Sequence, residues 1–241
     1  MRSGQRRSQV AVCALACCCC APAFAEPAAL DWEAAFPVEG AAKDVYLDAH
    51  FVGSDGTSHR LQLWRHGAQF LRRRTDEALD LYVHQAERAG DYSYRLIDHY
   101  RRVSIDVRRN QLYRIGVFSD WFGLAHVLDR PKTEFVARTV AALPQERQLP
   151  RLKESQMDCA WRSLQRGNRR SQDITRICWS AKWGLPLSIR ARGPKGEWTE
   201  QFTVDRVESL SPTLDGAVLQ AVPDGYAAFD AGNEIDPKEG D

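Results

Sequence analysis

Apolar and polar residues alternate along the chain from residue 44 to about residue 107, which is the pattern of strands that bury one face. In residues 45–51, VYLDAHF, every second residue is apolar. Asp55-Gly56 follows as a hairpin signal, because glycine adopts left-handed backbone conformations at little cost. The alternation returns in five further segments up to Val107, so this region is predicted to form a meander of six short strands.

The pattern changes after Gly116. In residues 117–131, VFSDWFGLAHVLDRP, four apolar residues at helical spacing share one face: Trp121, Leu124, Ala125 and Leu128. Ser119 or Asp120 can cap this helix, and Pro131 ends it. A second, short helix is predicted in LDWEAAF, residues 30–36.

Strand patterning resumes in the carboxyl half. One candidate strand is TEFVART, residues 133–139, and a polar connection is predicted over residues 143–156. Five more strands are predicted in DCAWRSLQR, DITRICWS, LPLSIRAR, WTEQFTVDRV and GAVLQAV. A sheet of about eleven strands curls rather than staying open and flat. We therefore predict a mainly β protein with one to three helices. Its fold is a curved antiparallel sheet, an unclosed half β-barrel with a helical lid over an apolar cavity.

The first 25 residues have the features of an export signal. Three arginines precede a short apolar run, and Ala23-Phe24-Ala25 supplies the small residues of a cleavage site. We expect a cleavable signal peptide over residues 1–25 and a periplasmic protein, with a single half-barrel domain over 26–232 and a disordered tail over 233–241. Lipid attachment at a signal cysteine is a second interpretation, although Ala14 stands where a lipoprotein motif prefers leucine before Cys17.

Removal of the signal changes both the charge and the cysteine count. The signal carries three arginines, no acids and five cysteines, which leaves 30 basic and 32 acidic residues and two cysteines, Cys159 and Cys178. A chain this close to neutral has no overall field that attracts nucleic acid. An even pair of cysteines in an exported protein predicts a disulfide, with a metal pair or a reactive thiol as the less favoured interpretations.

The sequence contains no Gly-x-Ser-x-Gly, no phosphate-binding glycine loop and no His-Glu-x-x-His. Asp48 and His50 share one strand face, and His84 or His99 would have to join them to hold a metal ion. Histidines on polar strand faces are more often simply solvated. We therefore expect no metal, no cofactor and no enzymatic activity, with a periplasmic hydrolase as the weakest alternative.

Basic doublets and triplets recur along the chain, at residues 72–74, 101–102, 108–109 and 169–170. On adjacent strands they would form an anion patch for a phosphate head group or an acidic partner. The other interpretation is a solvated strand edge, where arginine prevents edge-to-edge pairing. The sequence does not distinguish the two interpretations.

Three segments resemble the LolA/LolB/RseB-like periplasmic superfamily. The family's ribbon with a Gly-Leu-Pro-Leu corner resembles residues 178–208, CWSAKWGLPLSIRARGPKGEWTEQFTVDRVE. An earlier hairpin of the family resembles residues 61–77, LQLWRHGAQFLRRRTDE, and its closing segment resembles residues 222–231, VPDGYAAFDA. Their order and their spread over the chain support the resemblance. This chain departs from the family in its cysteine pair and its arginine density.

The resemblance implies a non-catalytic carrier that binds the acyl chain of a lipoprotein or a lipid in the cavity. The alternative is an RseB-like sensor that docks on an inner-membrane regulator through the arginine-rich face. Carrier and sensor need the same cavity. The residues expected to line the cavity or the lid are Leu61, Leu63, Phe70, Leu81, Trp121, Leu124 and Leu128.

Overall fold

The computed structural model describes residues 28–85, 92–108, 111, 120–146, 152, 158–167, 174–193, 195–210 and 222–231. The helical elements are α1 (Trp32–Ala35), α3 (Trp121–His126) and the 3-10 turn η1 (Pro144–Glu146). The strands are β1 (Val45–Val52), β2 (Ser58–His66), β3 (Phe70–Thr75), β4 (Leu79–Gln85), β5 (Tyr92–Asp98), β6 (Val103–Arg108), β7 (Phe135–Thr139), β8 (Ala160–Arg166), β9 (Ile174–Ser180), β10 (Leu185–Arg192), β11 (Trp198–Ser209) and β12 (Ala227–Asp230).

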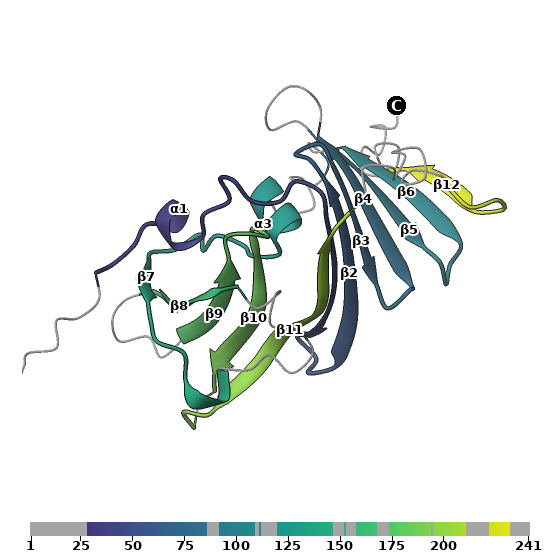
Figure 1. Ribbon diagram of the computed structural model, residues 1–241. Coiled ribbons are helices and arrows are strands. Elements are labelled where there is room, and N and C mark those ends of the chain that lie inside the picture. The colour runs from purple at the N-terminus through teal and green to yellow at the C-terminus, as the bar shows by residue number, and fades with distance from the viewer. Residues whose placement is uncertain are drawn as a thin grey trace, which may run out of the picture.

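All twelve strands belong to one sheet, in the order β12-β6-β5-β4-β3-β2-β1-β11-β10-β9-β8-β7. Neighbouring strands are antiparallel except β12, which runs parallel to β6. Figure 1 shows how strongly the sheet curves, and its two edge strands do not pair with each other. The predicted fold class, a mainly β protein with a large unclosed sheet, is confirmed. The predicted strand GAVLQAV, the signal segment and the tail lie outside the described residues.

Short polar turns set the register of the six-strand meander, β1 to β6. In the first turn, the Asp55 carboxylate accepts hydrogen bonds from the Thr57 amide at 3.0 Å and the Thr57 hydroxyl at 2.7 Å. Gly56 takes a positive φ of 80°, as the hairpin signal predicts. The resulting pairing sets Leu63 opposite Leu47 on β1, so the apolar residues of successive strands line up on one face.

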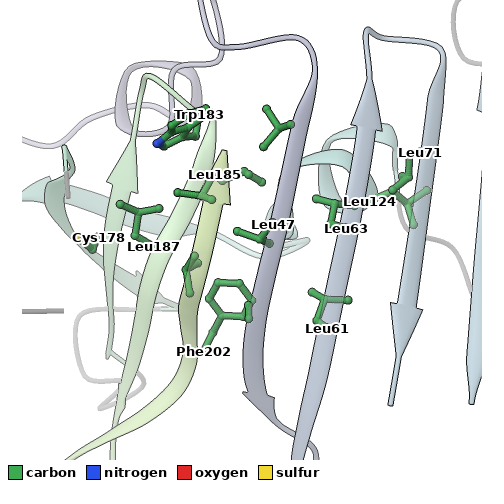
Figure 2. Packing of buried hydrophobic residues seen from close by; sticks show 14 of the residues in the cluster. Leu47, Leu61, Leu63, Leu71, Leu124, Cys178, Trp183, Leu185, Leu187 and Phe202 are labelled. Carbon is green, nitrogen blue, oxygen red and sulfur yellow. The ribbon is translucent and has the colours of Figure 1, made fainter. Parts of the chain in front are cut away.

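We call this apolar surface the inner face, because α3 packs on it. Buried residues of four neighbouring strands and of α3 meet there, as Figure 2 shows; among them are Leu47, Leu61, Leu63, Leu71, Leu124 and Phe202. Leu47 and Leu63 are fully buried, and Leu124 is 4% exposed. Burying a leucine side chain stabilises a fold by about 1.5–3 kcal/mol, so this cluster is a main source of stability.

At the other end of the sheet, β9 is buried on both faces. On one face Trp179 meets Phe36, which follows α1, with ring centroids 5.3 Å apart, and its indole N–H donates to the Pro37 carbonyl at 3.0 Å. On the other face, the Arg176 guanidinium pairs with the buried carboxylate of Glu146 in η1 at 2.6 Å. Asp31 caps the start of α1, and its carboxylate accepts a hydrogen bond from the Ala34 amide.

The two cysteines lie together in this region. Cys159 precedes β8 and Cys178 lies in β9, and their Cα atoms are 5.4 Å apart, within the range of disulfides. The pair is compatible with the predicted disulfide bond. Within the described ranges, no helix has the length and apolar composition needed to cross a membrane.

Candidate functional site

The candidate site is the inner face together with α3, which covers it. Five of the seven predicted residues belong to this cluster: Leu61, Leu63 and Leu124 are buried in it, and Leu81 and Trp121 pack against it. Leu128 lies just after α3 and packs in an adjoining cluster with Trp32 and Trp179. The structure thus brings the predicted lid and the β2 leucines together.

Phe70 lies on the opposite, outer face. It pairs with His66 and His84 in the sheet, and its ring stacks on the His84 ring with centroids 4.6 Å apart. Its neighbour Leu71 takes the inner position instead, opposite Arg65. Because Phe70 and Leu71 are both apolar and adjacent, the sequence does not show which of them points to the inner face. The pairing of β3 with β2 determines this.

α3 is short and depends on its surroundings. Asp120 caps the start of its six residues, and the Asp120 carboxylate accepts a hydrogen bond from the Gly123 amide at 2.7 Å. It ends at Val127 in the left-handed conformation, φ 55° and ψ 32°, which is uncommon for a β-branched residue. An isolated helix of this length is unstable in water, so packing and side-chain bonds from the sheet must hold it in place.

Arg65 supplies those bonds. Its side chain rises from the inner face of β2, is 3% exposed, and donates to the Ala125 carbonyl of α3 at 3.0 Å. It also donates to the Ala42 carbonyl at 2.8 Å and to the Trp183 carbonyl, in the turn between β9 and β10, at 2.7 Å. One guanidinium therefore connects α3, the segment before β1 and the β9–β10 turn.

His126 completes this connection from the last residue of α3. Its Nδ1 lies 2.6 Å from the Gly184 carbonyl, so Nδ1 carries the hydrogen and donates, while Arg65 lies 3.0 Å from the same nitrogen. Burial, and then the positive charge of Arg65, lower the pKa of His126 to about 4, against the opposing effect of the Gly184 bond. His126 is therefore neutral at pH 7, and it fits beside the Arg65 cation.

A pocket opens at the seam between α3 and the sheet. It has a volume of about 480 Å³ and is lined by residues 41–44 and 65–69, Val38, Trp121 and His126. The inner face itself is covered in this state, since Leu61, Leu63 and Leu124 are all buried. Leu152 and Trp161 are buried in the same cluster, so α3 is one of several elements that pack in it.

The outer face of β3 to β5 has a different character. Asp80 is 1% exposed, and its carboxylate accepts from Arg72 and Arg74 at 2.9 Å each and from the His99 ring at 2.9 Å. Burial would raise the pKa of Asp80, but these three hydrogen bonds outweigh it and hold the pKa well below its usual range. Arg72 and Arg74 thus form neither an anion patch nor a solvated edge, because they neutralise a buried carboxylate.

The four side chains considered for a metal site lie apart from one another. Asp48 pairs with Arg60, His50 with Asp205, and His99 with Asp80, while His84 stacks on Phe70. In the part of the chain that the structure describes, no three His, Cys, Asp or Glu residues gather into a group that could hold a metal ion.

Sequence reasoning missed Arg65, the residue that ties α3 to the sheet. The signal was present, because Leu61, Leu63 and Arg65 alternate on the inner face. A scan of protein-family models and a search of curated proteins find no match to this chain.

Proposed function

We propose that this protein is a non-catalytic periplasmic carrier that binds the acyl chain of a lipoprotein or a lipid on its inner face. The observation that carries the proposal is the packing of α3, through Leu124, among the leucines of the inner face. That helix is six residues long. Its described contacts include the Arg65 bond to Ala125, the His126 bond to Gly184, the packing of Leu124, and ring contacts of Phe122 with Trp32 and Trp179. Such a helix is suited to move as a lid.

The energetics of the proposed ligand fit this surface. An acyl chain gains roughly 0.8 kcal/mol for each CH₂ group that leaves water, so an apolar face without catalytic groups suffices for binding. Moving α3 would withdraw Leu124 from Leu63 and Leu71 and expose apolar surface on the sheet, which soluble proteins rarely leave uncovered. The ligand would replace the lid in covering it.

The sensor function has less support from the arginines. Four described arginines of the outer face are paired with carboxylates of the same sheet: Arg60, Arg72, Arg74 and Arg95. A docking surface for an acidic membrane regulator would need free cations. We therefore place the carrier first.

Native mass spectrometry of the protein purified from its own periplasm tests the proposal, followed by solvent extraction and lipid identification. We expect a co-purified lipid or acylated peptide that is lost in Leu124→Glu, because a carboxylate on α3 would be buried against the leucines. Tyr100→Glu, at a side chain that is 86% exposed, is the matched control and should retain the ligand. An empty wild-type protein that captures a membrane regulator would overturn the carrier in favour of the sensor.

A further inference from the structure

The arginine triplet of β3 divides between the two faces of the sheet. Arg72 and Arg74 point to the outer face and share Asp80. Arg73 lies on the inner face, where its partners in the neighbouring strands are Leu63 on β2 and Leu81 on β4. One positive charge of the three is therefore placed on the apolar side, next to the leucines that α3 covers.

This charge differs from that of Arg65 in its surroundings. Arg65 donates to three carbonyl groups. Arg73 makes no hydrogen bond or ion pair with any described residue. Among the described residues, the carboxylate of Asp129, beyond the end of α3, attracts it, and this attraction only partly offsets the burial that lowers the pKa of Arg73. Arginine stays charged in proteins at neutral pH, so Arg73 is a poorly compensated cation on an apolar face.

An apolar surface extends from Arg73 across the sheet. In register, Arg73 faces Leu63, Leu63 faces Leu47 and Leu47 faces Val207, and the last three are fully buried. Three steps between neighbouring strands cover roughly 14 Å, enough for a medium-length acyl chain. The guanidinium stands at one end of this row, and a flat, two-pronged donor of this kind matches the oxygens of a carboxylate or a phosphate.

We propose that the inner face binds a single-chain amphiphile whose oxyanion head pairs with Arg73 and whose acyl chain lies over the row Leu63, Leu47 and Val207. This inference rests on the proposed carrier function and narrows its ligand to acyl chains with an anionic head. The ligand oxyanion supplies the countercharge that Arg73 lacks among the described residues, and α3 closes over the chain.

Three probes with the same twelve-carbon chain test the inference: laurate, dodecyl phosphate and uncharged dodecanol. Each is titrated below its micelle concentration into the delipidated full-length protein and followed by calorimetry. We expect the two anions to bind at least tenfold more tightly than dodecanol. In Arg73→Gln this preference should vanish while dodecanol affinity stays within twofold, and Arg73→Lys should keep part of it. Arg192→Gln, at an exposed arginine of β10, is the control for general charge loss and should keep it fully.

Each other outcome has a distinct meaning. A preference for dodecyl phosphate alone that is lost in Arg73→Gln supports the inference and identifies the head as a phosphate. Equal binding of all three probes to the wild-type protein overturns the inference but leaves the carrier function intact, whereas no binding of any probe overturns both. The variant Asp129→Asn tests whether Arg73 acts through the segment after α3 or through the ligand. If it and Arg73→Gln weaken all three probes equally, Arg73 acts on α3 and the inference is wrong.

Discussion

At the β9 end of the sheet, α1 packs on one face of the strand, and the Cys159–Cys178 pair and η1 cover the other. At the β2 end, a helix of six residues covers one face and is joined to the sheet through Arg65. The first region combines large aromatic contacts with a buried ion pair. The second combines leucine packing with hydrogen bonds from Arg65 and His126, and Phe122 of its helix also packs on Trp179. For the proposed carrier, we take the first region as a rigid arm and the second as a movable cover.

The largest expected effect comes from breaking the rigid arm. Trp179→Ala removes a fully buried indole and leaves the Pro37 carbonyl without its donor, so we expect a loss of roughly 3–5 kcal/mol in the free energy of unfolding by urea denaturation. Leu124→Ala in α3 should cost less, about 2 kcal/mol, because the short helix can shift to fill the space. If Trp179→Ala lowered the free energy of unfolding no more than Leu124→Ala does, the contrast between the two regions would be wrong.

The cysteine pair gives the next effect. Closing a loop between residues 19 apart stabilises by about 3 kcal/mol, so a reductant should lower the urea midpoint of the wild-type protein by a corresponding amount. The double variant Cys159→Ala/Cys178→Ala should start at the lower midpoint and show no response to the reductant. An unchanged wild-type midpoint under reduction would mean that no disulfide stabilises this arm.

Breaking the connection at the lid has a smaller effect on stability and a larger one on local motion. Arg65→Met leaves the carbonyls of Ala42, Ala125 and Trp183 without their donor, and we expect a loss of roughly 2 kcal/mol. Hydrogen exchange of residues 121–126 should accelerate more than that of β9. Arg192→Met, at an exposed site, should change neither quantity. Equal acceleration in both regions would show that Arg65 stabilises the whole sheet rather than the lid.

Acid provides the mildest test of the lid. Because the pKa of His126 is lowered from 6.5 to about 4, the unfolded chain binds more protons than the folded one between these values. His126 therefore contributes stability that is fully present well above pH 6.5 and is lost as the pH falls towards 4, by roughly 1 kcal/mol at pH 5.5. The decrease in the free energy of unfolding between pH 7 and pH 5.5 should be smaller by this amount in His126→Gln than in the wild-type protein. A His126→Gln profile identical to wild type would refute the assignment.

Local patterns in the sequence predict much of the fold. Alternation anticipates β1 to β6, because each strand buries one face, and helical spacing anticipates α3. β12 was missed as a strand, since its four residues carry no alternation and it pairs with β6 across more than a hundred residues. The place of Phe70 on the outer face could not be read from the sequence for a related reason, because strand register is a property of the pair.

The candidate site was only partly predictable. Its leucines follow from the alternation, but the partners of Arg65 lie up to 118 residues away in the chain. The separation of the arginine triplet between the two faces of the sheet was also only partly predictable. Strand alternation sets Arg73 apart from Arg72 and Arg74, yet only the folded sheet reveals that Asp80 neutralises two of the three. Long-range pairing of charges leaves no local pattern to detect.

Hydrogen exchange with and without laurate tests the central claim most directly, that α3 is a lid over an acyl-chain site. In the free protein, residues 121–126 should exchange at least tenfold faster than residues 174–180 of β9, and saturating laurate should slow the helix while β9 stays unchanged. If α3 is as protected as β9 in the free protein, and laurate alters neither segment, then the helix is a fixed part of the core and the carrier account is wrong.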